Sequence, residues 1–201
     1  MEKKDHKPLL KFQLLFFILI LQLVHLEAQG PQLGAIRWDA WTGSDNAVGA
    51  QVEKSLSPSQ FHYRLPFFGV EVDTGTVTID GSFQEIVDKE IEYAYSAGLD
   101  YWAFVWYAPA SGLDEGRTLY HSSRYKALID YCLIIEDNRF INGISIDHLV
   151  NEFSDPSYVR VMNGRPLLYF FGYETLKVQD IDTLRARSIR KGQGDPYIVE
   201  L

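Results

Sequence analysis

The strongest constraint on the fold of this chain is a helical pattern that runs directly into a long apolar strand. Apolar side chains recur at helical spacing over Phe83–Ala97, and Gly98 suits the left-handed residue that often ends a helix. Ser82, with Glu85 three residues later, predicts a capping box at the start of this helix. Leu99–Tyr107 then follows as a nearly continuous apolar and aromatic run. Such a run, entered directly from a helix, predicts a parallel strand that is covered on both faces.

Strand and helix patterns alternate along the rest of the chain. The predicted strands are Leu33–Trp38, Leu99–Tyr107, Tyr131–Ile135, Leu167–Phe171 and Tyr197–Leu201. Besides residues 83–97, the predicted helices are Ser122–Asp130, Ile146–Phe153 and Thr183–Lys191. Because this alternation implies right-handed crossovers between neighbouring strands, the sequence predicts an α/β fold with a parallel sheet.

Two features separate the first strand from the helix at residues 83–97. Phe67–Val72 and Thr76–Ile79 flank the turn sequence Asp73-Thr74-Gly75, which predicts a small hairpin. The preceding residues 44–59 are polar and contain Gly and Ser, so the sequence assigns no helix or strand to them.

Residues 1–28 have the pattern of a secretory signal peptide. A lysine-rich head precedes the apolar run Leu14–Leu21, and Ala28 is the expected last residue removed. The alternative is an uncleaved membrane anchor, but an anchor normally needs about 20 apolar residues and polar side chains shorten this run. We therefore expect residues 29–201 to form a mature domain without a stable membrane span, either secreted, extracellular or periplasmic.

Composition and charge argue against several classes of function. The net charge of −8 and the isoelectric point of about 5.1 argue against nucleic-acid binding, which needs a basic surface. The single cysteine, Cys132, cannot form an internal disulfide or a cysteine-based zinc site, and we interpret it as a buried hydrophobe. His62, His121 and His148 lack the spacing of metal ligands, and no phosphate-binding loop is present. We predict no cofactor and assign no metal-binding residue; nothing in the sequence demands a metal, and the metal requirement and the oligomeric state stay open.

Aromatic and acidic residues gather where the predicted parallel strands end. Ligands of parallel α/β folds bind at the carboxyl ends of the strands. Aromatic rings cover the apolar C–H faces of pyranose rings, and carboxylates accept hydrogen bonds from sugar hydroxyls or transfer protons. The sequence therefore predicts a carbohydrate-binding cleft. Its candidate contact residues are Trp38, Asp39 and Trp41 after the first strand, Trp106 and Tyr107 after the second, and Glu136 after the third.

Several of these residues also have a purely structural interpretation. Because side chains alternate between the two faces of a strand, Trp106 fits the core as well as the cleft, and Trp102 fits the core better. Asp39 and Glu136 fit a helix cap or a salt bridge as well as a ligand contact. Asp100 opens its strand, at the end associated with stability, and we interpret it as structural.

Four segments, taken in order, resemble a known family. They are Gly34-Ala35-Ile36-Arg37-Trp38-Asp39-Ala40-Trp41, Arg64-Leu65-Pro66, Ala97–Tyr107 and Tyr158–Leu168. Their order is similar to that of the WbsX-like proteins and endo-α-mannosidase-like glycoside hydrolases, which are (β/α)8 barrels. The resemblance spans about residues 33–171. It implies that residues 29–201 form an incomplete (β/α)8 barrel of the TIM type, with about its first five strands.

The resemblance also implies a function. The chain is expected to be a secreted glycan-processing protein, a glycoside hydrolase that acts on an α-mannoside-like poly- or oligosaccharide. The sugar-contacting positions that the resemblance implies are Trp38, Asp39, Trp41, Trp106 and Tyr107. In the family, the essential carboxylates follow a later strand, in a segment that this sequence does not contain. No catalytic residue is therefore assigned, and activity is expected of a longer parent rather than of this chain alone.

Two alternatives stay open beside the hydrolase. One is a non-catalytic glycan-binding protein, which needs aromatic platforms but no pair of carboxylates. The other is a polysaccharide-biosynthesis protein of the glycosyltransferase type, against which the predicted signal peptide argues. Glu136-Asp137-Asn138 also departs from the aromatic, Asn-containing stretch of many relatives, which leaves the sugar and its linkage open.

Overall fold

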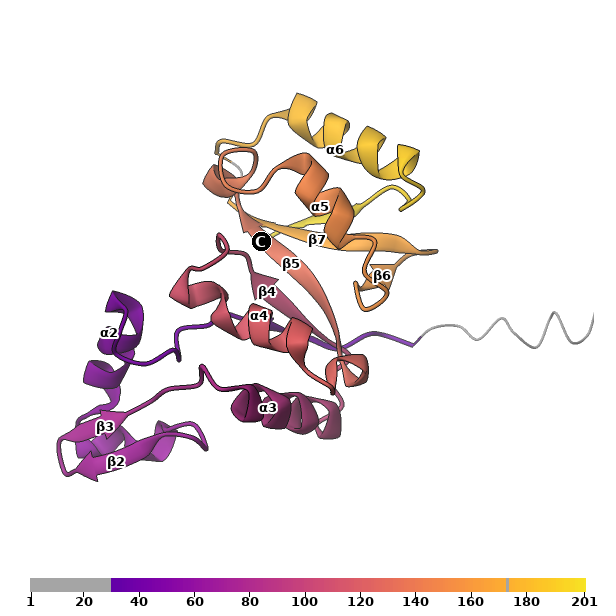
Figure 1. Ribbon diagram of the computed structural model, residues 1–201. Coiled ribbons are helices and arrows are strands. Elements are labelled where there is room, and N and C mark those ends of the chain that lie inside the picture. The colour runs from indigo at the N-terminus through magenta and orange to yellow at the C-terminus, as the bar shows by residue number, and fades with distance from the viewer. Residues whose placement is uncertain (1–29, 173) are drawn as a thin grey trace, which may run out of the picture. The chain divides into compact units, whose positions relative to one another are not determined.

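A sheet of five parallel strands lies at the centre of the computed structural model, which describes residues 30–172 and 174–201 (Figure 1). In spatial order the strands are β1 (Gly34–Arg37), β4 (Tyr101–Val105), β5 (Asp130–Glu136), β7 (Arg165–Phe171) and β8 (Tyr197–Glu200). Each of these strands lies beside the next one along the chain, without the reversal of order that marks a doubly wound sheet. The arrangement confirms the predicted α/β class and corresponds to the first part of a (β/α)8 barrel.

The sheet is open in the part of the chain that the structure describes. There β1 pairs with β4 alone and β8 pairs with β7 alone. The short strand β6 (Arg160–Val161) pairs antiparallel with the first residues of β7. At the amino ends of β1 and β4, the carboxylate of Asp100 accepts the backbone N–H of Leu33 at 2.6 Å. Asp100 therefore ties these two strands together, in agreement with its structural interpretation.

In the described part of the chain, four helices cover the outer face of the curved sheet (Figure 1). They are α3 (Gln84–Ser96), α4 (Glu115–Ser122), α5 (Ile146–Glu152) and α6 (Val178–Arg190). Aromatic rings fill the layer between α4 and the sheet: Tyr120 of α4 lies 5.4 Å from Phe104 and 5.5 Å from Tyr131, between ring centroids. Trp102 is also buried in this layer, as expected, and Cys132 is fully buried in the core of the sheet.

A smaller group of elements lies between β1 and α3 in the sequence. It comprises α2 (Ala47–Leu56), the 3-10 helix η1 (Ser59–Arg64) and the antiparallel hairpin of β2 (Val70–Asp73) and β3 (Thr76–Thr78). The hairpin was predicted, but the helix α2 was not. Asn46 caps this helix, because its side-chain oxygen accepts the backbone N–H groups of Val48 and Gly49.

Two predicted helices lie at shifted positions. The helix predicted over Ser122–Asp130 lies earlier, in α4, and only Lys126–Leu128 of that range forms a single 3-10 turn, η3. Ser123 ends α4 in an extended conformation, and its hydroxyl donates to Asp88 of α3 instead of continuing the helix. Likewise, α6 begins at Val178, five residues before its predicted start.

The predicted start of α3 is correct to within one residue, but its predicted capping box is wrong. The N-cap residue is Phe83, which makes no side-chain cap, while the hydroxyl of Ser82 donates to Asp80. Gly98 has a φ of +83°, so the left-handed end of this helix is confirmed.

The predicted signal peptide, residues 1–28, and its alternative, a membrane anchor, lie outside the described residues. Among the residues that the structure describes, no helix has the length and apolar character needed to cross a membrane.

Candidate functional site

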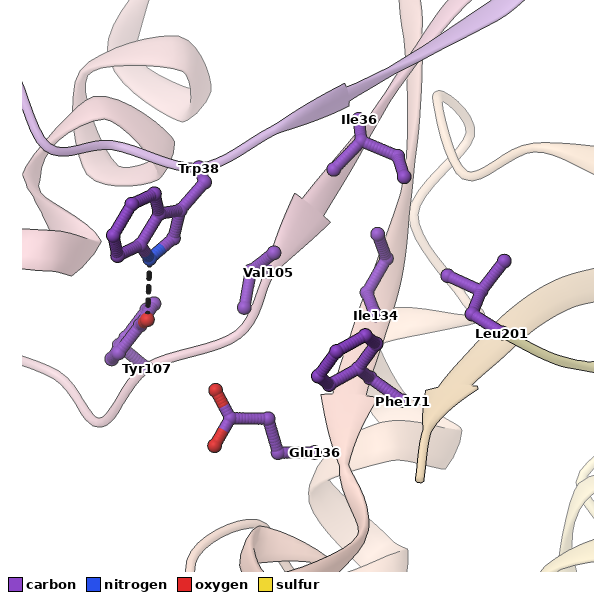
Figure 2. Close-up of a pocket in the computed structure, with 8 residues that line it drawn as sticks. All are labelled: Ile36, Trp38, Val105, Tyr107, Ile134, Glu136, Phe171 and Leu201. Carbon is purple, nitrogen blue, oxygen red and sulfur yellow. Dashed lines mark hydrogen bonds between the residues drawn. The ribbon is translucent and has the colours of Figure 1, made fainter. Parts of the chain in front are cut away.

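A cavity of about 310 Å³ lies at the carboxyl ends of the parallel strands (Figure 2). Its walls come from the ends of β1, β4, β5 and β7 and from the residue after β8. The eight lining residues are Ile36, Trp38, Val105, Tyr107, Ile134, Glu136, Phe171 and Leu201. Five of them are aliphatic or Phe, and three carry polar atoms in their side chains. This is the edge of the sheet at which the sequence predicted a ligand site.

The alternation of side chains along each strand selects these residues. Successive side chains of a strand point to opposite faces, so residues two apart share a face. Three pairs of lining residues follow this rule: Ile36 with Trp38, Val105 with Tyr107, and Ile134 with Glu136. The residues between them, such as Arg37, point toward the helices on the outer face. The cavity therefore lies on the inner, concave face of the partial barrel.

Trp38 and Tyr107 are hydrogen-bonded to each other and form one wall of the cavity (Figure 2). The indole Nε1–H of Trp38 donates to the hydroxyl oxygen of Tyr107 at 2.5 Å. Because the Tyr107 oxygen is the acceptor, its own proton can still be donated to a ligand. Trp38 is 51% exposed, which leaves much of its ring surface available for contact.

Glu136 supplies the carboxylate of the cavity. It is the last residue of β5, it is half-buried, and Figure 2 shows its carboxylate on the same side of the cavity as Tyr107. Its Oε2 atom lies 3.2 Å from the Nη2 atom of Arg139. A carboxylate placed in this way can accept hydrogen bonds from the hydroxyl groups of a ligand.

Asp39 does not reach the cavity, because it follows Trp38 and so points to the opposite face. It is only 5% exposed, and its Oδ1 atom accepts a hydrogen bond from Nε of Arg37 at 2.9 Å. The same guanidinium donates to Glu90 of α3 at 2.8 Å. Burial raises the pKa of Asp39, and the positive charge of Arg37 opposes this shift. The structure thus places Asp39 in the salt bridge that the sequence left open as its alternative.

Trp106 and Trp41 also lie outside the eight lining residues. Trp106 is 3% exposed and belongs to the core cluster, with its ring against Gly143. Trp41 is half-buried, and its carbonyl oxygen accepts the backbone N–H of Gly81 near the hairpin. Of the six predicted contact residues, the structure therefore brings three together: Trp38, Tyr107 and Glu136.

The loop after β5 joins neighbouring parts of the rim. Asp137 follows Glu136 and accepts the backbone N–H of Thr175, in the loop after β7, at 2.9 Å. This bond lowers the pKa of the Asp137 carboxyl, because it favours the charged form. Two residues farther on, Arg139 donates to the carbonyl oxygen of Trp106 at 3.0 Å. The same short loop thus connects to the loop after β7 on one side and to the end of β4 on the other.

Sequence reasoning did not select Arg139 or the apolar lining residues. Three of the apolar ones lie two residues before Trp38, Tyr107 and Glu136 and therefore point to the same face of the sheet. The alternation of side chains along a strand is thus the signal that identifies Ile36, Val105 and Ile134. Arg139 lies three residues after Glu136 in a turn, and this spacing was a usable signal for a salt bridge between them.

Comparison with known proteins gives distant structural matches. No protein-family profile and no curated protein sequence matches the chain. One similar solved structure is a GH99 endo-alpha-mannosidase from Bacteroides thetaiotaomicron, with 19% identity and a TM-score of 0.44 over 61% of this chain and 38% of that protein. A second is the GH99 endo-alpha-mannosidase of this organism in complex with bis-tris-propane, with 19% identity and a TM-score of 0.44 over 64% and 42% of the two chains. The chain spans about two fifths of the length of these structures.

The cavity has the chemistry of a binding site more than that of a complete hydrolytic centre. Glu136 is the only carboxylate among its eight lining residues, whereas glycoside hydrolysis normally uses a pair of carboxylates on either side of the scissile bond. Within residues 30–172 and 174–201, no group of three or more His, Cys, Asp or Glu side chains is placed to hold a metal ion. The residues at hand can therefore orient a ligand by ring contact and hydrogen bonding.

Proposed function

We propose that the cavity at the carboxyl ends of the strands binds a glycan. The observation that carries this proposal is the meeting of Trp38, Tyr107 and Glu136, from three different strands, around one open cavity. Indole and phenol rings match the apolar C–H faces of a pyranose. The Tyr107 hydroxyl and the Glu136 carboxylate supply a donor and an acceptor for sugar hydroxyls.

The dimensions of the cavity suit a short stretch of sugar. Its volume of about 310 Å³ is at the lower end of the range of about 300–1,000 Å³ that is typical of small-molecule sites. Leu201, Phe171 and Ile36 form an apolar wall on the side away from Trp38 (Figure 2). A sugar ring that contacts both walls would present its hydroxyl edge to Glu136.

We further propose that this chain is part of a secreted glycoside hydrolase that acts on an α-mannoside-like polysaccharide. The strand order of a (β/α)8 barrel supports a hydrolase of this architecture, and the basic and apolar pattern of residues 1–28 supports secretion. The unpaired outer edges of β1 and β8 in the described part of the chain support further strands that would supply the catalytic carboxylates.

A non-catalytic glycan-binding protein is the second candidate. The presence of a single carboxylate among the lining residues favours it, because binding does not require a pair. The two candidates share the same sugar contacts and differ in whether any form of the protein cleaves the glycan.

The test is a comparison of binding to and cleavage of soluble α-mannan oligosaccharides. We expect the chain to bind them and the variants Trp38→Ala and Glu136→Gln to bind at least tenfold more weakly, which corresponds to about 1.4 kcal/mol. Tyr63→Ala is the control, since Tyr63 is an 83% exposed aromatic residue that does not line the cavity. Equal affinity of the wild type, Trp38→Ala and Glu136→Gln would overturn the proposed site. A longer form of the protein, with the further strands proposed above, separates the two candidates. Sugar release by this longer form supports the hydrolase, and binding without release supports the glycan-binding protein.

A further inference from the structure

Arg139 does not line the cavity, but it contacts two of the lining residues, Tyr107 and Glu136, and the backbone of a third residue, Trp106. It ends the 3-10 turn η4 (Asp137–Arg139), which directly follows β5. Its guanidinium carbon lies 4.1 Å from the centroid of the Tyr107 ring. Its Nη1 atom donates to the carbonyl oxygen of Trp106 at 3.0 Å, and its Nη2 atom lies 3.2 Å from Oε2 of Glu136. One side chain thus contacts the ends of two neighbouring strands.

The backbone of Arg139 is also fixed. Its carbonyl oxygen accepts the N–H groups of Gly143 at 2.7 Å and Ile144 at 2.9 Å, which folds residues 139–144 back on themselves. A Cβ atom at position 143 would lie 2.9 Å from that carbonyl oxygen and 2.9 Å from the ring of Trp106, so only glycine fits there without a shift. The guanidinium therefore extends from a constrained turn.

The contacts continue from Arg139 to Trp38. The guanidinium stacks on the ring of Tyr107, and the hydroxyl of Tyr107 in turn accepts the indole N–H of Trp38. Trp38 itself directly follows β1 and is half exposed, and this hydrogen bond joins its ring to Tyr107. Glu136 is held by the same guanidinium from β5. All three polar lining residues are thereby linked to one cation.

We propose that Arg139 is a positioning residue that sets the arrangement of Tyr107, Trp38 and Glu136 at the rim of the cavity. Arginine suits this role because its planar guanidinium stacks on an aromatic ring and donates in its own plane at the same time. A lysine ammonium is a compact point charge and cannot do both with the same geometry. The consequence for ligand affinity rests on the proposed glycan function, whereas the arrangement of the three side chains does not.

The experiment measures the indole N–H resonances of the full chain by NMR, in the wild type and in Arg139→Met, Arg139→Lys and Arg124→Met. The chain has four tryptophans, and Trp38→Phe assigns the resonance of Trp38. Arg124 is the matched control: its guanidinium lies 4.7 Å from the Tyr125 ring and 3.7 Å from Asp88, but it is exposed and does not line the cavity.

We expect Arg139→Met to shift or broaden the Trp38 resonance while that of buried Trp102 keeps its position, since Trp102 lies on the helix side of β4. Arg139→Lys should restore the Trp38 resonance only in part, and Arg124→Met should leave it unchanged. Affinity for α-mannan oligosaccharides should fall at least threefold in Arg139→Met. Thermal unfolding shows whether each variant is folded, and Arg139→Lys provides the same test if Arg139→Met does not fold.

An unchanged Trp38 resonance in Arg139→Met, or in Arg139→Lys where only that variant folds, would overturn the proposal. If the wild type binds no glycan but the Trp38 resonance responds to Arg139→Met, the proposed function fails and the positioning role of Arg139 stands. If glycan binds and the resonance does not respond, the positioning role fails alone.

Discussion

Trp38 and Asp39 are neighbours in the chain but lie on opposite faces of the sheet. The pleat of a strand sends Trp38 to the inner face, where the cavity is, and Asp39 to the outer face, where Arg37 pairs with it. At the end of β4, Trp106 and Tyr107 likewise point to opposite faces, Trp106 into the core and Tyr107 into the cavity. At the scale of single residues, the parity of a position along its strand decides between a ligand contact and a structural role.

Gly116 tests the role of Asp39 as a buried structural group. A Cβ atom at this position would lie 2.2 Å from Oδ2 of Asp39. Glycine to alanine inside a helix normally stabilises it, by about 1 kcal/mol. For Gly116→Ala we expect the opposite sign, a loss of about 1–3 kcal/mol in the free energy of unfolding, because the carboxylate must move and its bond to Arg37 is disturbed.

Urea unfolding of Gly116→Ala and Gly75→Ala measures this effect. Gly75 lies in the exposed turn of the hairpin, where the nearest heavy atom to an added Cβ is 3.9 Å away, so its variant should change stability little. A Gly116→Ala protein as stable as the wild type would show that Asp39 is free to move, against the placement described above.

At the scale of elements, the strands and the helix α3 could be predicted from the sequence, because long apolar runs and helical periodicity are local signals. The start of α2 could not, because its cap is the single side chain of Asn46 within a polar stretch. The position of α4 depends on tertiary contacts: Ser123 ends it by bonding to α3, and Tyr120 donates to the carbonyl oxygen of Ile129 across the turn. Three of the six candidate contact residues line the cavity, because the sequence locates the ends of the strands but does not say which of the two faces at each end forms the cavity.

The contact between α4 and the start of β5 carries a pH dependence. His121 is half-buried, and its ring lies 4.8 Å from that of Tyr131. Burial lowers the pKa of His121. The positive charges of Lys126 and Arg117 lower it further, and the negative charges of Glu152 and Asp155 oppose this shift. The unfolded chain binds this proton at about pH 6.5, and the folded chain binds it only at lower pH. Stability from this group is therefore complete above about pH 6.5 and is lost as the pH falls toward the folded pKa.

Urea unfolding between pH 7.5 and 5.5 checks this sign. The free energy of unfolding should fall toward pH 5.5 in the wild type, and this fall should be smaller in His121→Gln. His148→Gln, which removes an exposed histidine from the neighbouring helix α5, is the matched variant. An identical pH dependence in His121→Gln and the wild type would contradict the assignment.

At the scale of the whole molecule, the parallel sheet buries one face under helices and leaves part of the other open. Ile36, Phe171 and Leu201 on the inner face are 64%, 60% and 48% exposed. A closed barrel would cover these side chains, because its interior is filled by layers from all the strands. The open inner face is consistent with the proposal that a longer form of the protein completes the barrel.

Two isoleucines of the same inner face allow its exposure in solution to be tested by substitution. Ile134 is 2% exposed and Ile36 is 64% exposed, although both line the cavity. We expect Ile134→Ala to lower the free energy of unfolding by about 2–5 kcal/mol and Ile36→Ala by less than about 0.5 kcal/mol. Equal costs in the isolated chain would mean that something covers β1 in solution, such as a second copy of the chain.

The most direct test of the central claim is a titration of the protein with soluble α-mannan oligosaccharides, followed through the indole N–H resonances of its four tryptophans. Trp38 lines the cavity, whereas Trp102 and Trp106 are buried on the helix side of the sheet. Glycan binding at the carboxyl ends of the strands predicts a saturable shift of the Trp38 resonance, with those of Trp102 and Trp106 nearly unmoved. A Trp38 resonance that stays in place throughout the titration would contradict the account.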